Sequence, residues 1–253
     1  MKTAIICILS AVLFLDARPL SGGVAPTPPP RPVQRILAVP DSTLSPDRRF
    51  GVTVPDAAAY DAARRESDGR QTAFLNRLVE VGTGRVLSEI KAENGMERMN
   101  HGGISPQWSA DGSVLLWVVV GKWFPRAVVV LKLDADEVTW QTDVLALSQQ
   151  EMLRRVRAEV PKTYAAAVEE NKGSGYAFPE GFTIDTILPK GRPRLPYRFT
   201  VKLTSNPKAI ETFPLRAELF AKMNGELGRD GRIRWSGFKV SRGGEARRLN
   251  TSE

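Results

Sequence analysis

The sequence predicts a mainly β protein, α+β overall, in which two similar antiparallel β units precede one long helix and a small antiparallel sheet. Short runs rich in β-branched and aromatic residues alternate with turn residues over residues 36–147 and again near the C-terminus, which is typical of antiparallel strands. Residues 148–172 instead repeat apolar side chains at steps of three and four, as an amphipathic helix does. With 253 residues, 42% hydrophobic and 25% charged, the chain is long enough for a sizeable core.

Residues 1–23 predict a secretory signal peptide. Lys2 supplies the positive region, and residues 4–15 form an apolar run that is too short to cross a bilayer as a helix but suits the core of such a signal. Cleavage is expected after Ala17 or Gly23, and Cys7 lies too early for a lipoprotein junction. We therefore expect a periplasmic or secreted protein with no stable membrane span after cleavage.

Residues 24–35 predict an extended tether between the signal and the folded part. Five of these twelve residues are prolines, which disfavour both helices and central strands. At the other end, residues 241–253 predict a polar tail.

The first β unit begins after the tether. Residues 45–49 predict a turn, and residues 50–54 follow as a strand. The alanine- and charge-rich residues 57–70 interrupt this pattern as a surface helix or an insertion. Residues 74–81 and 85–90 then predict a hairpin around a glycine-bearing loop.

The second unit, which ends at residue 143, repeats this order. A turn at residues 109–112 precedes a strand at 113–120, and a hairpin follows, with strands at 127–133 and 138–142 around an acidic turn. Ser45 matches Ser109 at an offset of 64 residues, and Val81 matches Leu133 at an offset of 52. The difference is close to the length of the alanine-rich segment, so we interpret the two units as copies of one unit with an insertion in the first.

The matching turns carry a short motif, Ser-Ala-Asp-Gly at residues 109–112 and Ser-Pro-Asp-Arg at residues 45–48. With the strand and acidic turn that follow, this motif resembles a blade of the WD-like β-propellers. The nearest variety is the Ser-Pro-Asp-Gly repeat of the periplasmic propeller of the Tol system and of secreted bacterial relatives. Over residues 36–143 the resemblance implies two propeller-blade-like units and a binding role, with no catalytic residue. Closed propellers have at least about four blades, and two are visible here.

The C-terminal region, residues 148–240, predicts the long helix and the small sheet. Ser148 and Glu151 match a capping box, and Pro161 should kink the helix or divide it in two. Strands are expected at 182–188, 197–203 and 233–240, with a strand or short helix at 215–223. A turn containing Asp-Gly at residues 228–231 predicts the last hairpin.

Charge and aromatic residues supply the candidate binding sites. Residues 1–143 hold 16 basic and 16 acidic side chains, whereas residues 144–253 hold 20 and 12, so the formal charge of +8 comes from the C-terminal part. Arginine forks suit carboxylate or phosphate groups. An aromatic loop flanked by cations suits a protein or another partner, while we expect Trp108, Trp117 and Trp140 to lie in the core. The candidate binding residues are Lys122, Trp123, Phe124, Arg126, Arg192 and Arg194, and the wider cationic set adds Lys190, Arg198, Arg229, Arg232 and Arg234.

No pattern predicts catalysis, a metal or a cofactor. The only cysteine lies in the signal, which excludes disulfides and zinc–thiolate sites from the mature chain. His101 before two glycines would suit an esterase oxyanion loop, but no Gly-x-Ser-x-Gly elbow accompanies it. Asp134, Asp136 and Glu137 fit a turn better than a calcium loop.

These observations predict an exported non-catalytic binding protein of the cell envelope or extracellular space. Its expected partner is a protein or an anionic envelope polymer, not nucleic acid, because exported proteins rarely meet nucleic acid. The alternatives are a hydrolase of a cell-wall or extracellular polymer that uses an acidic pair not visible in the sequence, and a structural accessory subunit.

Overall fold

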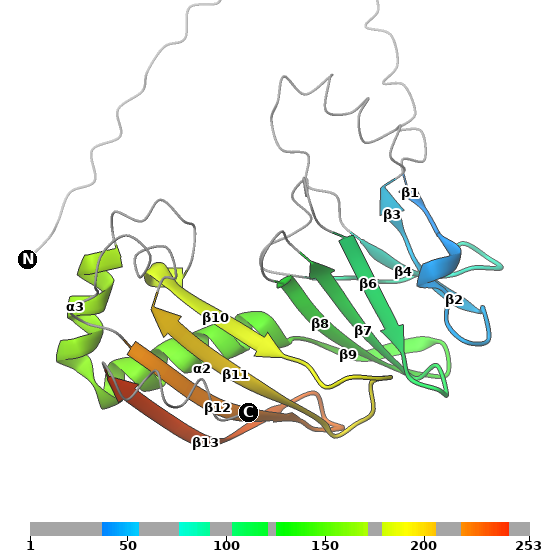
Figure 1. Ribbon diagram of the computed structural model, residues 1–253. Helices are drawn as coiled ribbons and strands as arrows, with labels where there is room; N and C mark the ends of the chain where they lie inside the picture. Colours follow the sequence, from blue (N-terminus) through cyan, green and yellow to red (C-terminus); the bar gives the residue numbers. More distant parts are fainter. Residues whose placement is uncertain are drawn as a thin grey trace, which may run out of the picture. The chain divides into compact units, whose positions relative to one another are not determined.

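The computed structural model describes residues 37–55, 76–91, 103–120, 125–171, 179–205 and 219–242. These residues form a mainly β structure of antiparallel sheets with two α-helices, as the sequence predicts at this level (Figure 1). The expected signal peptide, the tether and the tail beyond Arg242 lie outside the described residues. The domain boundary expected between residues 147 and 148, which would separate the two β units from the C-terminal region, stays a prediction.

The first unit is a small antiparallel sheet in the order β2-β4-β5. A two-residue pairing of β1 with β3 and a short 3-10 helix, η1, lie beside it in the sequence. The alanine-rich residues 57–70 lie outside the described residues. The elements are β1 (Leu37–Ala38), η1 (Asp41–Thr43), β2 (Phe50–Val52), β3 (Val54–Pro55), β4 (Arg77–Glu80) and β5 (Val86–Glu89).

The second unit is a four-stranded antiparallel meander in the order β6-β7-β8-β9. Its last three strands match the predicted ones to within a few residues, whereas the strand at residues 103–108 was not predicted. The acidic turn contains Ala135 with a φ of 53°. The strands are β6 (Gly103–Trp108), β7 (Val114–Val120), β8 (Pro125–Asp134) and β9 (Glu137–Asp143).

The two Ser-x-Asp turns make the same hydrogen bonds. In each turn the serine hydroxyl donates to the aspartate two residues later, at 2.6 Å in both copies. The same hydroxyl accepts an N–H from the residue five positions on, at 3.0 and 2.8 Å. The fourth turn residue adopts positive φ in both copies, which favours the glycine of the second copy over the arginine of the first. The two sets are Ser45, Asp47, Phe50 and Arg48, and Ser109, Asp111, Val114 and Gly112.

One main-chain hydrogen bond of the first unit has an equivalent in the second unit at the two sequence offsets of 52 and 64 residues. In the first unit the Val81 N–H donates to the Arg49 carbonyl at 2.8 Å. In the second unit the Leu133 N–H donates to the Ser113 carbonyl at the same distance. The donors differ by 52 residues and the acceptors by 64, so the two units place equivalent residues together despite the extra segment in the first.

A threonine side chain takes the place of one strand in the first unit. The Thr43 hydroxyl donates to the Val52 carbonyl at 2.9 Å and accepts the Val52 N–H at 3.2 Å. Sixty-four residues later, Gln107 of β6 pairs with Leu116 of β7 as strand partners. The first unit therefore has a 3-10 turn where the second unit has an outer strand, and the threonine hydroxyl satisfies the buried main chain of Val52.

Strands β7 and β8 are buried on both faces, because their alternate side chains enter two different hydrophobic cores. One core packs this sheet against the first unit and includes Trp117, which is 1% exposed. The other core packs the opposite face against the helices and the C-terminal sheet. The first core contains Leu115, Trp117, Val119, Val129 and Leu131, and the second contains Val114, Leu116, Val118, Val128 and Val130.

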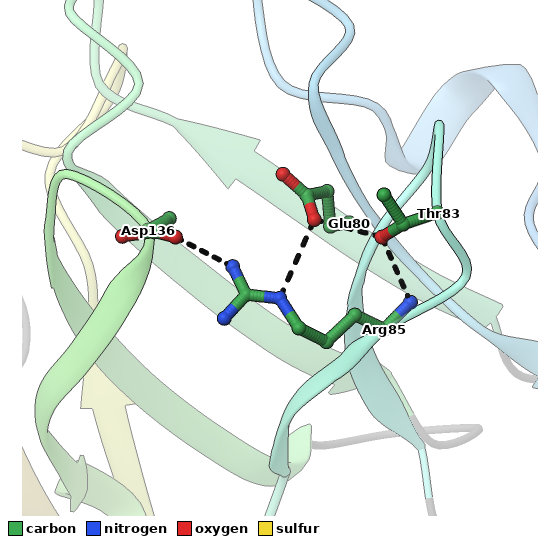
Figure 2. Close-up of polar contacts among 4 residues, drawn as sticks. All are labelled: Glu80, Thr83, Arg85 and Asp136. Atoms are coloured by element: carbon green, nitrogen blue, oxygen red, sulfur yellow. Dashed lines mark hydrogen bonds and ion pairs between the residues drawn. The ribbon is translucent and has the colours of Figure 1, made fainter.

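Polar contacts also join the first unit to the second (Figure 2). Arg85 donates from Nη2 to Asp136 Oδ2 at 2.6 Å and from Nε to Glu80 Oε2 at 3.4 Å. Thr83 Oγ1 donates to the same Glu80 oxygen at 2.7 Å. The Thr83 hydroxyl and, after it, the Arg85 guanidinium hold the pKa of Glu80 below its ordinary value. This cluster links the hairpin turn of one unit to the equivalent turn of the other.

The predicted long helix is divided into α2 (Val144–Glu159) and α3 (Pro161–Asn171). Pro161 takes the first position of α3, where its missing N–H costs nothing. The predicted capping box is wrong. The helix begins at Val144, and its cap is Asp143, five residues before Ser148. The Asp143 side chain accepts the Ala146 N–H at 3.0 Å. Ser148 is buried inside the helix, and Glu151 instead accepts hydrogen bonds from two arginines of α2.

The C-terminal sheet is antiparallel in the order β10-β11-β12-β13. One face packs on α2 and α3, where Tyr164 stacks on Phe182 with ring centroids 5.5 Å apart. In the segment 215–223, predicted as a strand or short helix, the described residues 219–223 belong to a strand, because they pair with neighbours on both sides. The strands are β10 (Phe182–Ile187), β11 (Tyr197–Ser205), β12 (Leu219–Leu227) and β13 (Ile233–Arg242), and the short 3-10 helix η2 (Pro179–Gly181) precedes them.

The turn of the β12–β13 hairpin contacts β9 through two side chains. Trp140 Nε1 donates to the Arg229 carbonyl at 2.9 Å, and Thr142 Oγ1 donates to the Gly231 carbonyl at 2.8 Å. Gly231 has a φ of 75° and lies under the Trp140 ring, so that a Cβ there would meet the ring at 2.8 Å. This contact joins the C-terminal sheet to the second β unit.

Replacing Asp111 with alanine should destabilise the fold, because its carboxylate accepts hydrogen bonds from the Ser109 hydroxyl and from the N–H and hydroxyl of Ser113. We expect a loss of about 1 kcal/mol in the free energy of unfolding. The matched variant Asp47→Ala should lose less, since Asp47 accepts only from the Ser45 hydroxyl and the Arg49 N–H among the described residues. Urea unfolding at neutral pH measures both.

The loss at Asp111 should also depend on pH. The Ser109 hydroxyl and then Ser113 lower the pKa of Asp111 to about 2, from an ordinary value of 3.8. A lowered pKa stabilises the fold above the unfolded value, and this stabilisation disappears as pH falls through about 2. The difference in the free energy of unfolding between wild type and Asp111→Ala should therefore become smaller as the pH is lowered. A difference that does not change with pH would contradict this role of Asp111.

Gly231→Ala should destabilise the chain by about 1–3 kcal/mol, because it combines positive φ with a clash against Trp140. Gly191→Ala is the control, since Gly191 has a φ of 98° but no atom within 4 Å of a Cβ. Thermal unfolding followed by tryptophan emission should show a clearly larger loss for Gly231→Ala. Equal losses would mean that backbone conformation alone explains the glycine.

Candidate functional site

The candidate site is the outer face of the C-terminal sheet, meaning the face turned away from α2 and α3. Because side chains alternate across a strand, β11 and β12 direct their odd-numbered residues into the core and their even-numbered ones outward. The inward residues are buried and mainly apolar, whereas the outward ones are mainly charged or polar. The sheet therefore needs only one of its faces for the core.

Three lysines lie directly opposite one another on neighbouring strands of the outer face. Lys202 of β11 pairs with Lys222 of β12, which pairs with Lys239 of β13. Asp185 of β10 lies opposite Lys202 at the end of the row. Burial raises the pKa of Asp185, and the nearby Lys202 charge opposes this shift only in part. The row gathers positive charge on one line across the sheet.

Two arginines share one carboxylate further along the outer face. Glu226 of β12 accepts from Arg198 Nε at 2.8 Å on one side and from Arg234 Nη2 at 2.7 Å on the other. These guanidiniums, Arg234 first, hold the pKa of Glu226 below its ordinary value. The two arginine side chains remain 79% and 74% exposed. Glu226 thus fixes both arginines while leaving their remaining donors toward solvent.

A pocket of about 580 Å³ lies between Arg198 and the end of β10; Glu226 lines it, but Arg234 does not. Ile187, which is 44% exposed, forms an apolar wall with Leu188 and Pro189. Polar residues from three neighbouring strands line the rest. These are Arg198, Thr200, Asn224, Glu226 and Ser236.

The binding residues proposed from the sequence divide into those outside the described residues and those that the structure places. Lys122, Trp123 and Phe124 lie outside the described residues, so their role stays a prediction. Arg126 is exposed in β8, and Arg192 and Arg194 are exposed in the loop between β10 and β11. None of these three lines the pocket.

The sequence pattern places Arg198 and Arg234 in the cationic set but does not indicate that they meet. Glu226 and the lysine row were missed. The signal that could have located them is the Asp-Gly turn at residues 228–231, because a hairpin turn fixes which residues face each other. Counting outward from that turn sets Glu226 opposite Arg234.

The outer face of the C-terminal sheet offers neither a close acidic pair nor a metal site among the residues that the structure describes. Asp185 and Glu226 share the outer face but lie two strands and four residues apart, about 16 Å. Glycosidase carboxylates lie about 5 to 10 Å apart. Within the described ranges no group of three His, Cys, Asp or Glu residues could hold a metal ion.

Comparison with protein-family models, with curated proteins and with solved structures finds no match for this chain. Among the helices of the described residues, none is long and apolar enough to cross a membrane.

Proposed function

We propose that this chain is an exported, non-catalytic binding protein that captures an anionic partner on the outer face of its C-terminal sheet. The observation that carries this proposal is the row of three facing lysines beside two exposed arginines that share one glutamate. Five cations and two carboxylates give this part of the sheet a net positive charge. Such a field attracts and orients anionic groups.

The lysine row is costly for the fold, which favours a role in binding. Like charges directly opposite each other destabilise a sheet by about 0.2–1 kcal/mol per pair. The row contains two such pairs, Lys202 with Lys222 and Lys222 with Lys239, and Asp185 opposite Lys202 offsets part of the repulsion at that end. An anionic ligand that lies along the row would remove this repulsion. The free energy that the repulsion costs the free protein would then add to the free energy of binding.

The partner class is a protein or an anionic polymer of the envelope or extracellular space. The proposal of export rests on the predicted signal at residues 1–23 and makes nucleic acid an unsuitable target. The alternative hydrolase would need an acidic pair other than Asp185 and Glu226, since these two outer-face carboxylates are about 16 Å apart.

The two β units are proposed to be propeller-blade-like supports for the rest of the chain. The shared turn hydrogen bonds, the four-stranded meander and the core between the two sheets support this interpretation. The far face of the second unit packs against α2 and the C-terminal sheet. The units therefore act as paired layers in this proposal and not as part of a closed ring.

Lys222→Glu should separate binding from stability. A glutamate between two lysines converts repulsion into attraction, so the free energy of unfolding should rise by about 0.5 kcal/mol. Binding to labelled polyglutamate or heparin, measured by fluorescence anisotropy, should weaken about tenfold or more. Lys162→Glu on the exposed start of α3 makes the same charge change away from the face and should leave binding nearly unchanged. Equal effects of the two variants would refute the assignment of the face.

Export makes its own prediction. Mass spectrometry of the protein recovered from outside the cytoplasm should give an N-terminus after residue 17 or residue 23. Replacing Ile5 and Leu9 with arginine should retain the full-length chain inside the cell, because charges disrupt the apolar run. A full-length chain recovered outside with Met1 intact would contradict the signal.

A further inference from the structure

Strand β10 ends before β11 does, and this leaves the first residues of β11 without a strand partner on the side of the pocket, where Leu188 and Pro189 form the opposite wall. The pairing of the two strands stops at Ile187 and Thr200, whereas β11 begins at Tyr197. Continuing the same register by two residues would set Pro189 opposite Arg198. Proline has no N–H to donate, so a strand cannot continue there with its normal pairing.

The main chain of Arg198 faces this open edge. The Gly228 N–H donates to the Arg232 carbonyl at 2.9 Å, which makes them a hydrogen-bonded pair of the β12–β13 hairpin. Because such pairs alternate along antiparallel strands, even-numbered residues of β12 near the turn bond to β13 and odd-numbered ones to β11. Gly225 therefore bonds to its partner Phe199. Arg198, one residue earlier, directs its N–H and carbonyl the opposite way, toward the end of β10.

Arg198 beside this edge and Arg234 two strands away, both bonded to Glu226, keep donors for a second carboxylate. A guanidinium carries five N–H donors. Arg198 uses Nε for Glu226, and Arg234 uses Nη2, so the nitrogens that remain can bind another carboxylate in fork geometry. Glu226 balances one of the two positive charges and holds both arginines in place.

Resting on the proposed function, we propose that this pocket binds an extended acidic peptide segment. The peptide adds a strand beside β11 by pairing with the main chain of Arg198, and one of its carboxylates binds Arg198 and Arg234. An apolar side chain of the peptide packs against Ile187 and Leu188. The pocket thereby recognises an acidic residue near an apolar one.

A peptide fits this pocket better than other anions for two reasons. Only a polypeptide presents alternating N–H and carbonyl groups that match an open strand edge. Nucleic acid bases would instead need an exposed aromatic platform. Phe199 is the only aromatic among the described lining residues, and it is 4% exposed.

The test uses the full chain and a short labelled peptide in which valine and glutamate alternate. Two matched peptides isolate the two contacts: one carries N-methyl groups at alternate residues and cannot pair with the edge, and the other has glutamine in place of glutamate. Each change should weaken binding about tenfold in fluorescence anisotropy, as expected for the loss of one or two hydrogen bonds to a charged or paired group.

Protein variants test the same contacts from the other side. Arg234→Gln should weaken binding of the valine–glutamate peptide about tenfold, while Arg154→Gln on the exposed face of α2 should leave it unchanged. Circular dichroism and urea unfolding confirm that each variant folds. The N-methyl comparison needs no variant, so it decides the edge pairing even if Arg234→Gln fails to fold.

The outcomes separate this inference from the proposed function. If the N-methyl peptide binds as well as the parent while Lys222→Glu still weakens polyanion binding, the edge pairing is wrong and the anion-binding face stands. A heparin fragment whose binding is lost in Arg234→Gln, with no peptide binding, would assign the pocket to an anionic polysaccharide and overturn the inference. If neither peptide nor polyanion binding responds to any outer-face variant, both proposals fail.

Discussion

The burial of β7 and β8 on both faces is the constraint on which the rest of the structure depends. Each strand sends alternate side chains into two cores, so the sheet needs one layer on each side. The first β unit covers one face. The helices and the inner face of the C-terminal sheet cover the other, and Trp140 on Gly231 joins the last hairpin to β9. The first β unit and the C-terminal part each cover one face of the β7–β8 sheet. Neither β unit therefore exposes both of its faces to water.

Sequence patterns identified the elements better than their ends. The Ser-x-Asp turns could be predicted because the serine and aspartate side chains form their hydrogen bonds within the turn itself. These bonds are the same in both units. The helix start was misplaced for a physical reason. Residues 144–147 are apolar and continue from a strand, while Ser148 and Glu151 imitate a cap; the actual cap is Asp143, the last residue of β9. A side chain that ends one element and caps the next is not distinguishable by pattern alone.

The site was less predictable than the fold because it depends on register. Arg198 and Arg234 are 36 positions apart, and only the pairing of β11, β12 and β13 sets them on either side of Glu226. The lysine row likewise arises from three strands that each carry one lysine at the same level. Alternation predicted which residues face outward, but not which of them become neighbours. Loop candidates such as Arg192 stood out in the sequence because they cluster there.

The two faces of the C-terminal sheet have different roles, because one packs in the core and the other carries the charged residues. This difference explains why the fold tolerates such a charged surface. The inner residues, among them Val201, Leu203 and Met223, are fully buried and supply the packing. The outer residues can then be chosen for a ligand, at a cost of about 1 kcal/mol or less for each facing lysine pair. Glu226 limits this cost at the arginines, since it compensates one of the two charges and fixes both side chains before a partner arrives. A carboxylate that joins them finds donors already oriented, so less conformational entropy is lost on binding.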